Sequence, residues 1–253
     1  GGALGVENAL KVAFDWKVRK NMEKGKGEKG GKIIHFKQAF HGRTGYTLSL
    51  TNTSDPRKTM YFPKFDWPRI DIPKLSFPIT DIVLQEVEKN ERIAIAQIKS
   101  ALENNQDDVA ALIIEPIQGE GGDNHFRDEF FGALRQLCDE NEMLFIMDEV
   151  QTGIGITGKW WAHQHFSVKP DIISFGKKTQ VCGLLAGKRV EEVENNVFSE
   201  SSRINSTFGG NLVDMTRFKI ILEIIEEEDL LLNSKKIGNY LLQKLMNLQE
   251  YQM

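Results

Sequence analysis

Hydrophobic and polar residues follow two different rhythms along this chain. The first rhythm is a short, largely apolar run that stops at a polar residue or a glycine, and it occurs at 109–114, 143–147 and 171–175. Runs of this kind are typical of strands that are buried on both faces. We therefore predict three strands in these places, and a fourth, shorter β-prone segment at 32–36.

The second rhythm repeats at helical spacing. It covers 126–141, the beginning of the chain, where Leu4, Leu10 and Trp16 belong to one apolar stripe, and 237–248. Strands that alternate with helices predict an α/β fold with a mainly parallel sheet and helices on both faces. The segment 53–80 interrupts this alternation. It holds five of the seven prolines, so we expect a long ordered excursion there and not one helix or strand.

Composition narrows the class of protein. The 253 residues are 40% hydrophobic and 27% charged, and the net charge of −4 argues against nucleic acid or a membrane surface as a partner. No apolar run approaches the roughly 18 residues of a membrane span, and the first residues lack the layout of a signal peptide. Cys138 and Cys182 have neither metal-ligand spacing nor a disulfide framework, so we expect free thiols, no metal and a cytoplasmic location.

Polar residues follow the predicted strands at the edge where chemistry collects in parallel sheets. Glu115 follows one strand, Asp148 a second and Lys177 a third. An unpaired carboxylate directly after five apolar residues would be costly to bury, so Asp148 needs a cationic or hydrogen-bonding partner. A protonated pyridine nitrogen is one such partner. A lysine that follows a strand is by itself more often an ordinary loop residue. Lys177 becomes a candidate because Glu115 and Asp148 follow the other two strands in the same way.

The segment around Asp148 resembles the signature of a known enzyme family. The run Ile-Met-Asp-Glu-Val-Gln-Thr-Gly at 146–153, with Lys177 standing 29 positions after Asp148 and directly after a glycine, is similar to the class III aminotransferases. Further segments match this family in the same order, at 2–11, 40–44, 115–122 and 206–211. The resemblance implies the large domain of a fold type I enzyme, with pyridoxal 5′-phosphate (PLP) as cofactor.

The resemblance assigns a role to each residue around the cofactor ring. Lys177 forms the Schiff base with PLP, which suits an amine whose pKa its surroundings can lower, and then moves a proton on the substrate. Asp148 keeps the ring nitrogen protonated, so that the ring accepts the electrons of a substrate carbanion. Phe40 and Val150 pack on the two faces of the ring. Gln151 hydrogen-bonds its phenolic oxygen.

Two further assignments concern the choice of lysine and the cofactor phosphate. Lys178 is chemically capable of the same role, but we prefer Lys177 because the family places its lysine directly after the glycine. Gly2 and Ala3 resemble the turn and helix start whose free backbone N–H groups bind the phosphate. Thr207 resembles the residue that reaches the phosphate of the neighbouring subunit, which implies a homodimer with shared active sites.

Longer similarities narrow the substrate. The segments 62–71, 176–183 and 203–207 look like the branch of the family that acts on the terminal amine of lysine, and not like the ornithine or acetylornithine branches. The resemblance implies that Arg43 and Asn205 hold the α-carboxylate of L-lysine and that 2-oxoglutarate receives the amino group. Glu120 is then the switch that admits both substrates, by swinging away from an arginine in the family's C-terminal domain.

Other interpretations stay open. The segment 153–158 matches the Gly-x-Gly-x-x-Gly fingerprint of dinucleotide sites, but no helical pattern follows it. Asp171 also begins its predicted strand, whereas the ribose-binding acid should end one. An NAD-dependent oxidoreductase is therefore the weaker alternative. Two more are an inactive fragment of this fold and another class III aminotransferase, for ornithine, acetylornithine or 4-aminobutyrate.

The ends of the chain suggest a piece of a longer protein. There is no initiator Met, and nothing follows the last helical pattern for it to pack against. We therefore expect truncation on both sides. We assign 1–225 to a PLP-binding large domain and 226–253 to the start of a C-terminal small domain.

Overall fold

The structure, a computed structural model, describes residues 1–248 and is built on one six-stranded sheet. The strands lie in the order β2-β1-β3-β4-β5-β6, and every neighbouring pair is parallel except β5 and β6, which are antiparallel. The strand bounds are β1 Lys32–Phe36, β2 Arg69–Ile70, β3 Val109–Ile114, β4 Leu144–Asp148, β5 Ile172–Phe175 and β6 Gly183–Ala186. The predicted α/β class and mainly parallel sheet are confirmed.

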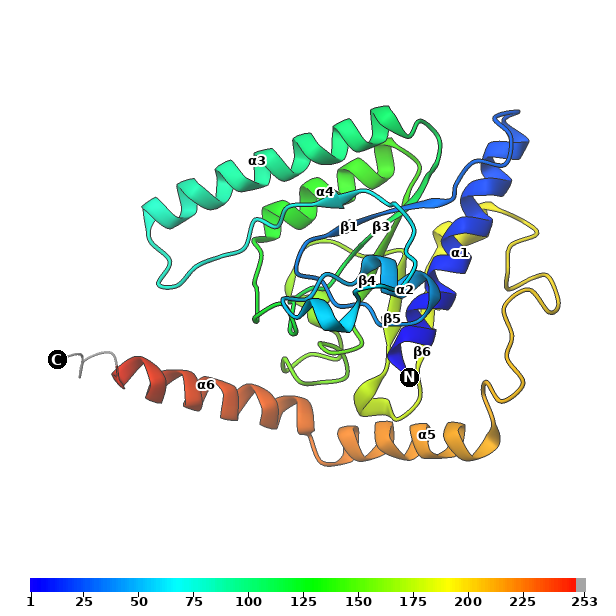
Figure 1. The fold of residues 1–253 in the computed structure, drawn as a ribbon. Helices are drawn as coiled ribbons and strands as arrows, with labels where there is room; N and C mark the ends of the chain where they lie inside the picture. The colour runs from blue at the N-terminus through cyan, green and yellow to red at the C-terminus, as the bar shows by residue number, and fades with distance from the viewer. Residues whose placement is uncertain (249–253) are drawn as a thin grey trace.

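Helices cover both faces of this sheet (Figure 1). On one face α1 (Gly2–Glu23) packs against β3, β5 and β6, and α2 (Gly45–Leu50) lies beside it. On the other face α4 (Asp128–Glu140) packs against β4, and α3 (Asp81–Asn104) packs against α4 and β2. Both layers of helices that the alternating pattern predicts are therefore present.

Alternate residues of the central strands contribute to two separate apolar layers. In β3, Ile113 belongs to the layer under α1, while Leu112 and Ile114 belong to the layer under α3 and α4. Trp16 of α1 is fully buried in the first layer and Phe131 of α4 in the second. Burial of each such side chain stabilises the fold by about 1.5–3 kcal/mol. The strands are unbroken apolar runs because both of their faces are covered.

Several elements go beyond what the sequence pattern predicts. The helices α2, α3 and α5 (Leu212–Glu227) are not among the predicted elements, and only four of the 24 residues of α3 are buried. β6 adds an antiparallel edge strand. The segment 53–80 is an excursion without a long helix, as expected, but it also contains the 3₁₀ turn Pro56–Lys58 and contributes β2 to the sheet.

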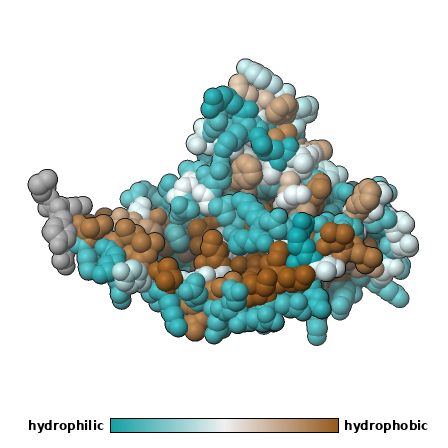
Figure 2. Space-filling view, turned by 90° about the horizontal axis from the view of Figure 1, so that it is seen from below, coloured by the Kyte–Doolittle hydropathy of each residue, from teal (hydrophilic) through white to brown (hydrophobic). Residues whose placement is uncertain are grey.

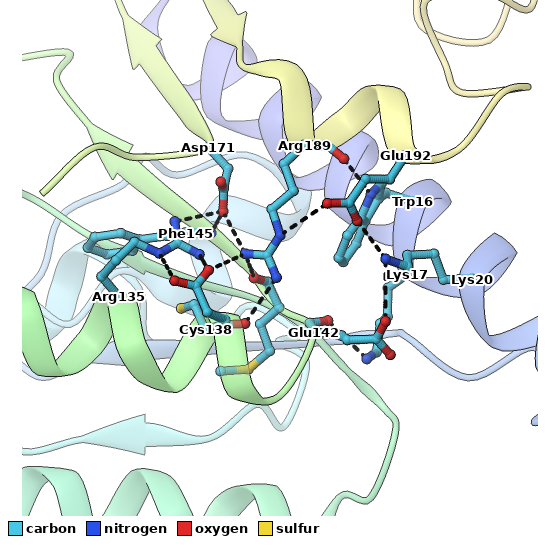
Figure 3. Close-up of polar contacts among 12 residues, drawn as sticks. Trp16, Lys17, Lys20, Arg135, Cys138, Glu142, Phe145, Asp171, Arg189 and Glu192 are labelled. Carbon is cyan, nitrogen blue, oxygen red and sulfur yellow. Dashed lines mark hydrogen bonds and ion pairs between the residues drawn. The ribbon is translucent and has the colours of Figure 1, made fainter.

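The carboxylate of Asp171, just before β5, is bound by two arginine side chains (Figure 3). Its Oδ2 accepts hydrogen bonds from Arg135 at 2.9 Å, from Arg189 at 3.2 Å and from the backbone N–H of Phe145 at 2.7 Å. The segment 153–158 forms turns and does not begin a helix. A dinucleotide site needs a free acid and a helix start at these places. Both features speak against the NAD alternative.

α5 (Leu212–Glu227) and α6 (Leu230–Leu248) carry an apolar face that the described residues leave uncovered. Figure 2 shows this face as brown surface along the two helices; its most exposed members are Leu212, Val213, Ile237, Leu241, Leu242, Leu245, Met246 and Leu248.

None of the helices within residues 1–248 is long and apolar enough to cross a membrane. The predicted boundary between the large and small domains, at 225/226, falls inside α5 and stays a prediction. Residues 249–253, the last part of the predicted small domain, lie outside the described residues.

Candidate active site

Asp148 is the last residue of β4, and only 4% of it is exposed. Its Oδ1 accepts hydrogen bonds from the backbone N–H of Val150 at 3.0 Å and from the hydroxyl of Ser174, in β5, at 3.2 Å. Its Oδ2 accepts one from Nδ1 of His41 at 2.8 Å. A carboxylate has about four lone-pair sites, so one remains for a further donor. The buried Asp148 thus has the partners that its position demands, and room for a ring nitrogen.

The turn that contains Phe40 is fixed to β3 and to α1 by two buried carboxylates. The backbone N–H of Phe40 donates to Oε1 of Glu115, at the end of β3, at 2.9 Å. Glu7 of α1 accepts hydrogen bonds from the hydroxyl of Thr44 at 2.8 Å and from the backbone N–H of Thr47 at 3.2 Å. The structure therefore places the half-buried Phe40 at the same edge of the sheet as Asp148.

The N-terminus of α1 lies directly beside Val150 and Gly176. A methyl group at Gly2 would lie 2.5 Å from Cγ1 of Val150, and one at Gly176 would lie 3.3 Å from Cα of Gly2. At Gly42 the φ angle is +126°, and a methyl group would lie 2.5 Å from Cβ of Ala3. Glycine alone allows such approaches. The first turn of α1 has no side-chain cap, so its N–H groups suit an anion, and the cradle fits the phosphate of PLP.

Lys177 begins the 3₁₀ turn Lys177–Thr179 directly after β5, with a φ of +53°. This left-handed conformation is uncommon for a residue other than glycine and often marks a functional site. The exposed Nζ of Lys177 donates to Oε1 of Gln151 at 2.6 Å, whereas Nζ of Lys178 donates to the backbone carbonyl of Gln151 at 2.5 Å. Burial, together with the charge of Lys177, lowers the pKa of Lys178. Of the two lysines, Lys177 reaches the side chain predicted to contact the cofactor.

Glu149 is a buried carboxylate to which the sequence analysis gives no role. Its Oε1 accepts hydrogen bonds from the backbone N–H of His163 at 2.8 Å and from that residue's Nδ1 at 3.0 Å. Its Oε2 accepts them from the hydroxyl of Thr152 at 2.6 Å and from the backbone N–H of Ala162 at 3.0 Å. Glu149 therefore closes the loop on which Gln151 lies. The only sequence signal is a second acid directly after the strand.

Glu120 lies in the loop 118–124, which is closed by an antiparallel bridge between its two ends. A methyl group at Gly119 would lie 2.5 Å from Nε2 of Gln151, so this loop packs against the residue that Lys177 contacts. The carboxylate of Glu120 forms an ion pair with Lys58 from the segment 53–80. The predicted switch residue is therefore close to the site, and it has a cationic partner within the described residues.

Three residues with predicted roles make no hydrogen bond or ion pair, among the described residues, with the residues around Asp148. Arg43 follows Gly42 in the turn, and its side chain is exposed. Asn205 and Thr207 are exposed in the irregular segment before α5, and no hydrogen bond or ion pair between described residues joins them to Asp148. Their roles stay predictions. A role for Thr207 in the site of another subunit would not be visible in one chain.

Four of the five sequence segments thus meet at the carboxyl ends of β3, β4 and β5, and this agrees with the family comparison. The chain belongs to the class III aminotransferases, since the family described as aminotransferase class-III matches residues 1–253. Enzymes called L-lysine-epsilon aminotransferase are among its relatives. The one from Mycobacterium tuberculosis is 54% identical over 246 residues, which cover 97% of this chain and 54% of that protein.

A second relative and a solved structure agree with this match. The L-lysine-epsilon aminotransferase of Amycolatopsis lactamdurans is 50% identical over 250 residues, covering 99% of this chain and 55% of that protein. The structure of lysine aminotransferase from M. tuberculosis in the internal aldimine form superimposes with a TM-score of 0.94 at 54% identity, covering 98% of this chain and 56% of the other. The chain spans about half the length of the relatives it matches.

Proposed function

We propose that the protein to which this chain belongs is a PLP-dependent aminotransferase that moves the ε-amino group of L-lysine to 2-oxoglutarate. The products would be 2-aminoadipate 6-semialdehyde, which cyclises, and glutamate. One observation carries the proposal: buried Asp148 ends β4 and exposed Lys177 follows the neighbouring strand β5 after one glycine, beside an uncapped helix start that packs on Val150. The 54% identity to L-lysine-epsilon aminotransferase supports lysine as the substrate.

PLP, when bound, supplies an aldehyde for the substrate amine and a ring that accepts electrons from the substrate carbon. Around the ring, Asp148 holds the nitrogen protonated through its free lone pair, and Gln151 donates to the phenolic oxygen. Phe40 and Val150 confine the ring between them. The backbone N–H groups of Gly2 and Ala3 hold the phosphate, as in our assignment from the resemblance.

Lys177 would hold the cofactor covalently and would move a proton of the substrate. Its exposed amine is free to reach a ligand, and among the described residues its one side-chain partner is the amide oxygen of Gln151, a neutral group that it can leave. A lysine used in this way has to be neutral for part of the cycle.

The substrate carboxylate is assigned to Arg43 and Asn205, and the exchange of substrates to Glu120. L-lysine presents one carboxylate far from the reacting amine, whereas 2-oxoglutarate presents a second carboxylate near the reacting carbon. Glu120 must therefore release a cation when the dicarboxylate enters. Its ion pair with Lys58 supports this, because it offers the carboxylate a second cationic partner away from the site.

We also propose a homodimer in the cytoplasm. Thr207 is exposed and makes no hydrogen bond with another described residue, as expected of a residue that serves the neighbouring subunit. Tyr61 is 92% exposed and Phe62 56%, and large aromatic side chains at the surface favour a protein interface. Both Cys138 and Cys182 are free, which is the usual state in a reducing compartment.

The cofactor assignment is tested with the full-length protein. We expect a visible absorption band from lysine-bound PLP, which borohydride abolishes while leaving the cofactor on one peptide that contains Lys177. Lys177→Arg should lose the band and the activity, whereas the control Lys178→Arg should keep the band. A label on a peptide without Lys177, or a protein that binds NAD and no PLP, would overturn the assignment.

The substrate assignment needs its own measurement. Glutamate formation from 2-oxoglutarate should be fastest with L-lysine, and the lysine product should be trapped as a cyclic imine. Ornithine and 4-aminobutyrate are the comparison substrates, because they represent the other branches of the family considered above. Faster turnover of either one would leave the PLP assignment intact and reject lysine.

A further inference from the structure

His41 is a buried histidine that the proposed reaction does not use. Its side chain has no exposed surface, and its Nδ1 lies 2.8 Å from Oδ2 of Asp148. Among the described residues its Nε2 has no hydrogen-bond partner. The backbone N–H of His41 donates to the hydroxyl of Thr51 at 3.0 Å, and that hydroxyl donates to the carbonyl of Gly42 at 2.6 Å. These hydrogen bonds hold the turn so that the imidazole ring points at Asp148, although Nε2 makes no hydrogen bond with a described residue.

Three titratable groups face the imidazole, one from each neighbouring strand. Asp148 ends β4 and Glu115 directly follows β3, where burial raises the pKa of Glu115 to about 7 against the opposing charge of His41. His35 of β1 is neutral, since burial lowers its pKa to about 3 and the charge of Arg69 adds to that effect. Burial alone would lower the pKa of His41, but the hydrogen bond to Asp148 and the charges of both acids outweigh it, so the pKa is raised.

The two acids are close enough in the sheet to affect each other. Ile114 pairs with Met147 in the parallel register of β3 and β4, so Glu115 and Asp148 are the next residues of adjacent strands. Burial and, to a smaller extent, the negative charge of Asp148 raise the pKa of Glu115. A protonated Asp148 is neutral and no longer favours a protonated ring nitrogen on the cofactor. A cation between the acids removes this problem.

We propose that His41 is a positioning residue: its imidazolium keeps Asp148 ionised and orients the carboxylate so that a free lone pair meets the ring nitrogen of PLP. Glu115 stabilises the imidazolium as the second negative charge. The inference rests on the proposed function, because it takes PLP as the group that Asp148 binds. His41 acts through Asp148 and touches neither cofactor nor substrate.

The main test uses the full-length protein loaded with PLP that carries ¹⁵N in the ring. His41→Asn keeps an N–H donor near the place of Nδ1 but cannot be charged. At pH 7.5 we expect its ring-nitrogen resonance to move toward the unprotonated value, and kcat to fall about 10–100-fold with little change in KM, the usual size of outer-shell effects. His35→Gln is the matched control. It removes an equally buried but neutral imidazole, keeps an acceptor for Arg69 and should leave the resonance unchanged.

Glu115→Gln tests the second acid. The glutamine keeps an acceptor for the backbone N–H of Phe40 but has no charge, so we expect a smaller shift of the ring-nitrogen resonance in the same direction. If His41→Asn and unsubstituted protein give the same resonance, His41 is only a packing residue and the proposal is wrong.

A second measurement does not need the cofactor or a His41 variant. The ring of His41 in the unsubstituted protein, followed by NMR against pH, should be an imidazolium at pH 7, and Asp148→Asn should lower its pKa. A neutral His41 at pH 7 contradicts the inference even if PLP binds normally. Conversely, a full-length protein that binds no PLP rejects the proposed function, while this titration still decides whether His41 keeps Asp148 ionised.

Discussion

Gly42 and Ala3 are in direct contact, although 39 residues separate them in the sequence. With φ at +126°, a methyl group at Gly42 would lie 2.5 Å from Cβ of Ala3 and 2.7 Å from Oγ1 of Thr47. This contact joins the start of α1 to the turn that holds His41 against Asp148. The proposed phosphate site and ring site can therefore lie side by side only if residue 42 is a glycine.

The substitution Gly42→Ala should push the start of α1, the proposed phosphate site, away from the turn that contains His41. A strained backbone conformation costs about 1–3 kcal/mol, and here the overlap with Ala3 adds to it. We expect a loss of unfolding free energy of at least about 2 kcal/mol by urea denaturation. We also expect PLP affinity to fall more than about tenfold, since two anion-binding N–H groups move.

Gly25→Ala is the control for backbone strain alone. Gly25 also has a positive φ, of +69°, but a methyl group there meets nothing within 4 Å. It lies beyond the far end of α1, in the turn after Glu23. This variant should lose about 1–2 kcal/mol and bind PLP normally. Equal PLP affinities for the two variants would show that the contact with Ala3 does not shape the site.

The strands and the acid and lysine at their ends are predictable because they depend on local pattern. β3, β4 and β5 are buried on both faces, so each is a run of apolar residues, and the first polar residue after it lies at the functional edge. Asp148 and Lys177 are found in this way. α3 is not found in this way, because it is no buried apolar run: only four of its 24 residues are buried.

The roles of His41 and Glu149 could not be predicted from the sequence. His41 lies within a recognisable segment, but its contact with Asp148 spans 107 positions and exists only once β1 and β4 share a sheet. Glu149 binds backbone N–H groups 13 and 14 positions further on, in a loop without regular pattern. Contacts of this kind are set by the fold, so a single sequence contains no periodic signal for them.

Asp171→Ala tests the network in Figure 3 as a stability element that lies outside the site. The substitution removes the less exposed of the two carboxylates that Arg135 and Arg189 share, and leaves Asp139, whose side chain is 58% exposed, in contact with both. Removing one partner of a buried ion pair typically costs about 3–5 kcal/mol, and the remaining contact with Asp139 reduces this cost. We expect the unfolding free energy to fall by up to that amount, with an unchanged visible band of bound PLP.

The exposed pair of Asp55 and Arg57 provides the comparison for this prediction. The Arg57 side chain is 83% exposed, and water and salt screen such a surface pair, so it contributes little to stability. Arg57→Ala, which leaves Asp55 as the cap of the turn Pro56–Lys58, should therefore lower the unfolding free energy much less than Asp171→Ala. Similar losses for Arg57→Ala and Asp171→Ala would mean that the arginines at Asp171 are effectively solvated.

Glu115 should make the protein less stable as the pH rises. Its pKa is about 7 in the folded state against an ordinary value of 4.5, so the folded state retains a proton that the unfolded state has released. Its contribution to stability is complete below pH 4.5 and is lost as the pH rises to about 7. The unfolding free energy, relative to that of Glu115→Gln, should fall by up to about 1.4 kcal/mol per pH unit in this window. Urea denaturation across pH 4–8 measures it, and a difference independent of pH would contradict it.

His35 should have the opposite effect. Burial and the charge of Arg69 lower its pKa from 6.5 to about 3, so between these values the unfolded state binds a proton that the folded state does not. The unfolding free energy should therefore decrease as the pH falls below 6.5, again by up to about 1.4 kcal/mol per pH unit. His35→Gln keeps an acceptor for the N–H of Arg69, which His35 accepts at 3.1 Å, and removes the titrating group. In the same pH series, the unfolding free energy of His35→Gln should rise relative to that of the unsubstituted protein only below pH 6.5. The relative unfolding free energy of Glu115→Gln should be lowest at this acidic end. Parallel profiles for His35→Gln and the unsubstituted protein would show that His35 has the same pKa in the folded and unfolded states, and would contradict the lowered pKa.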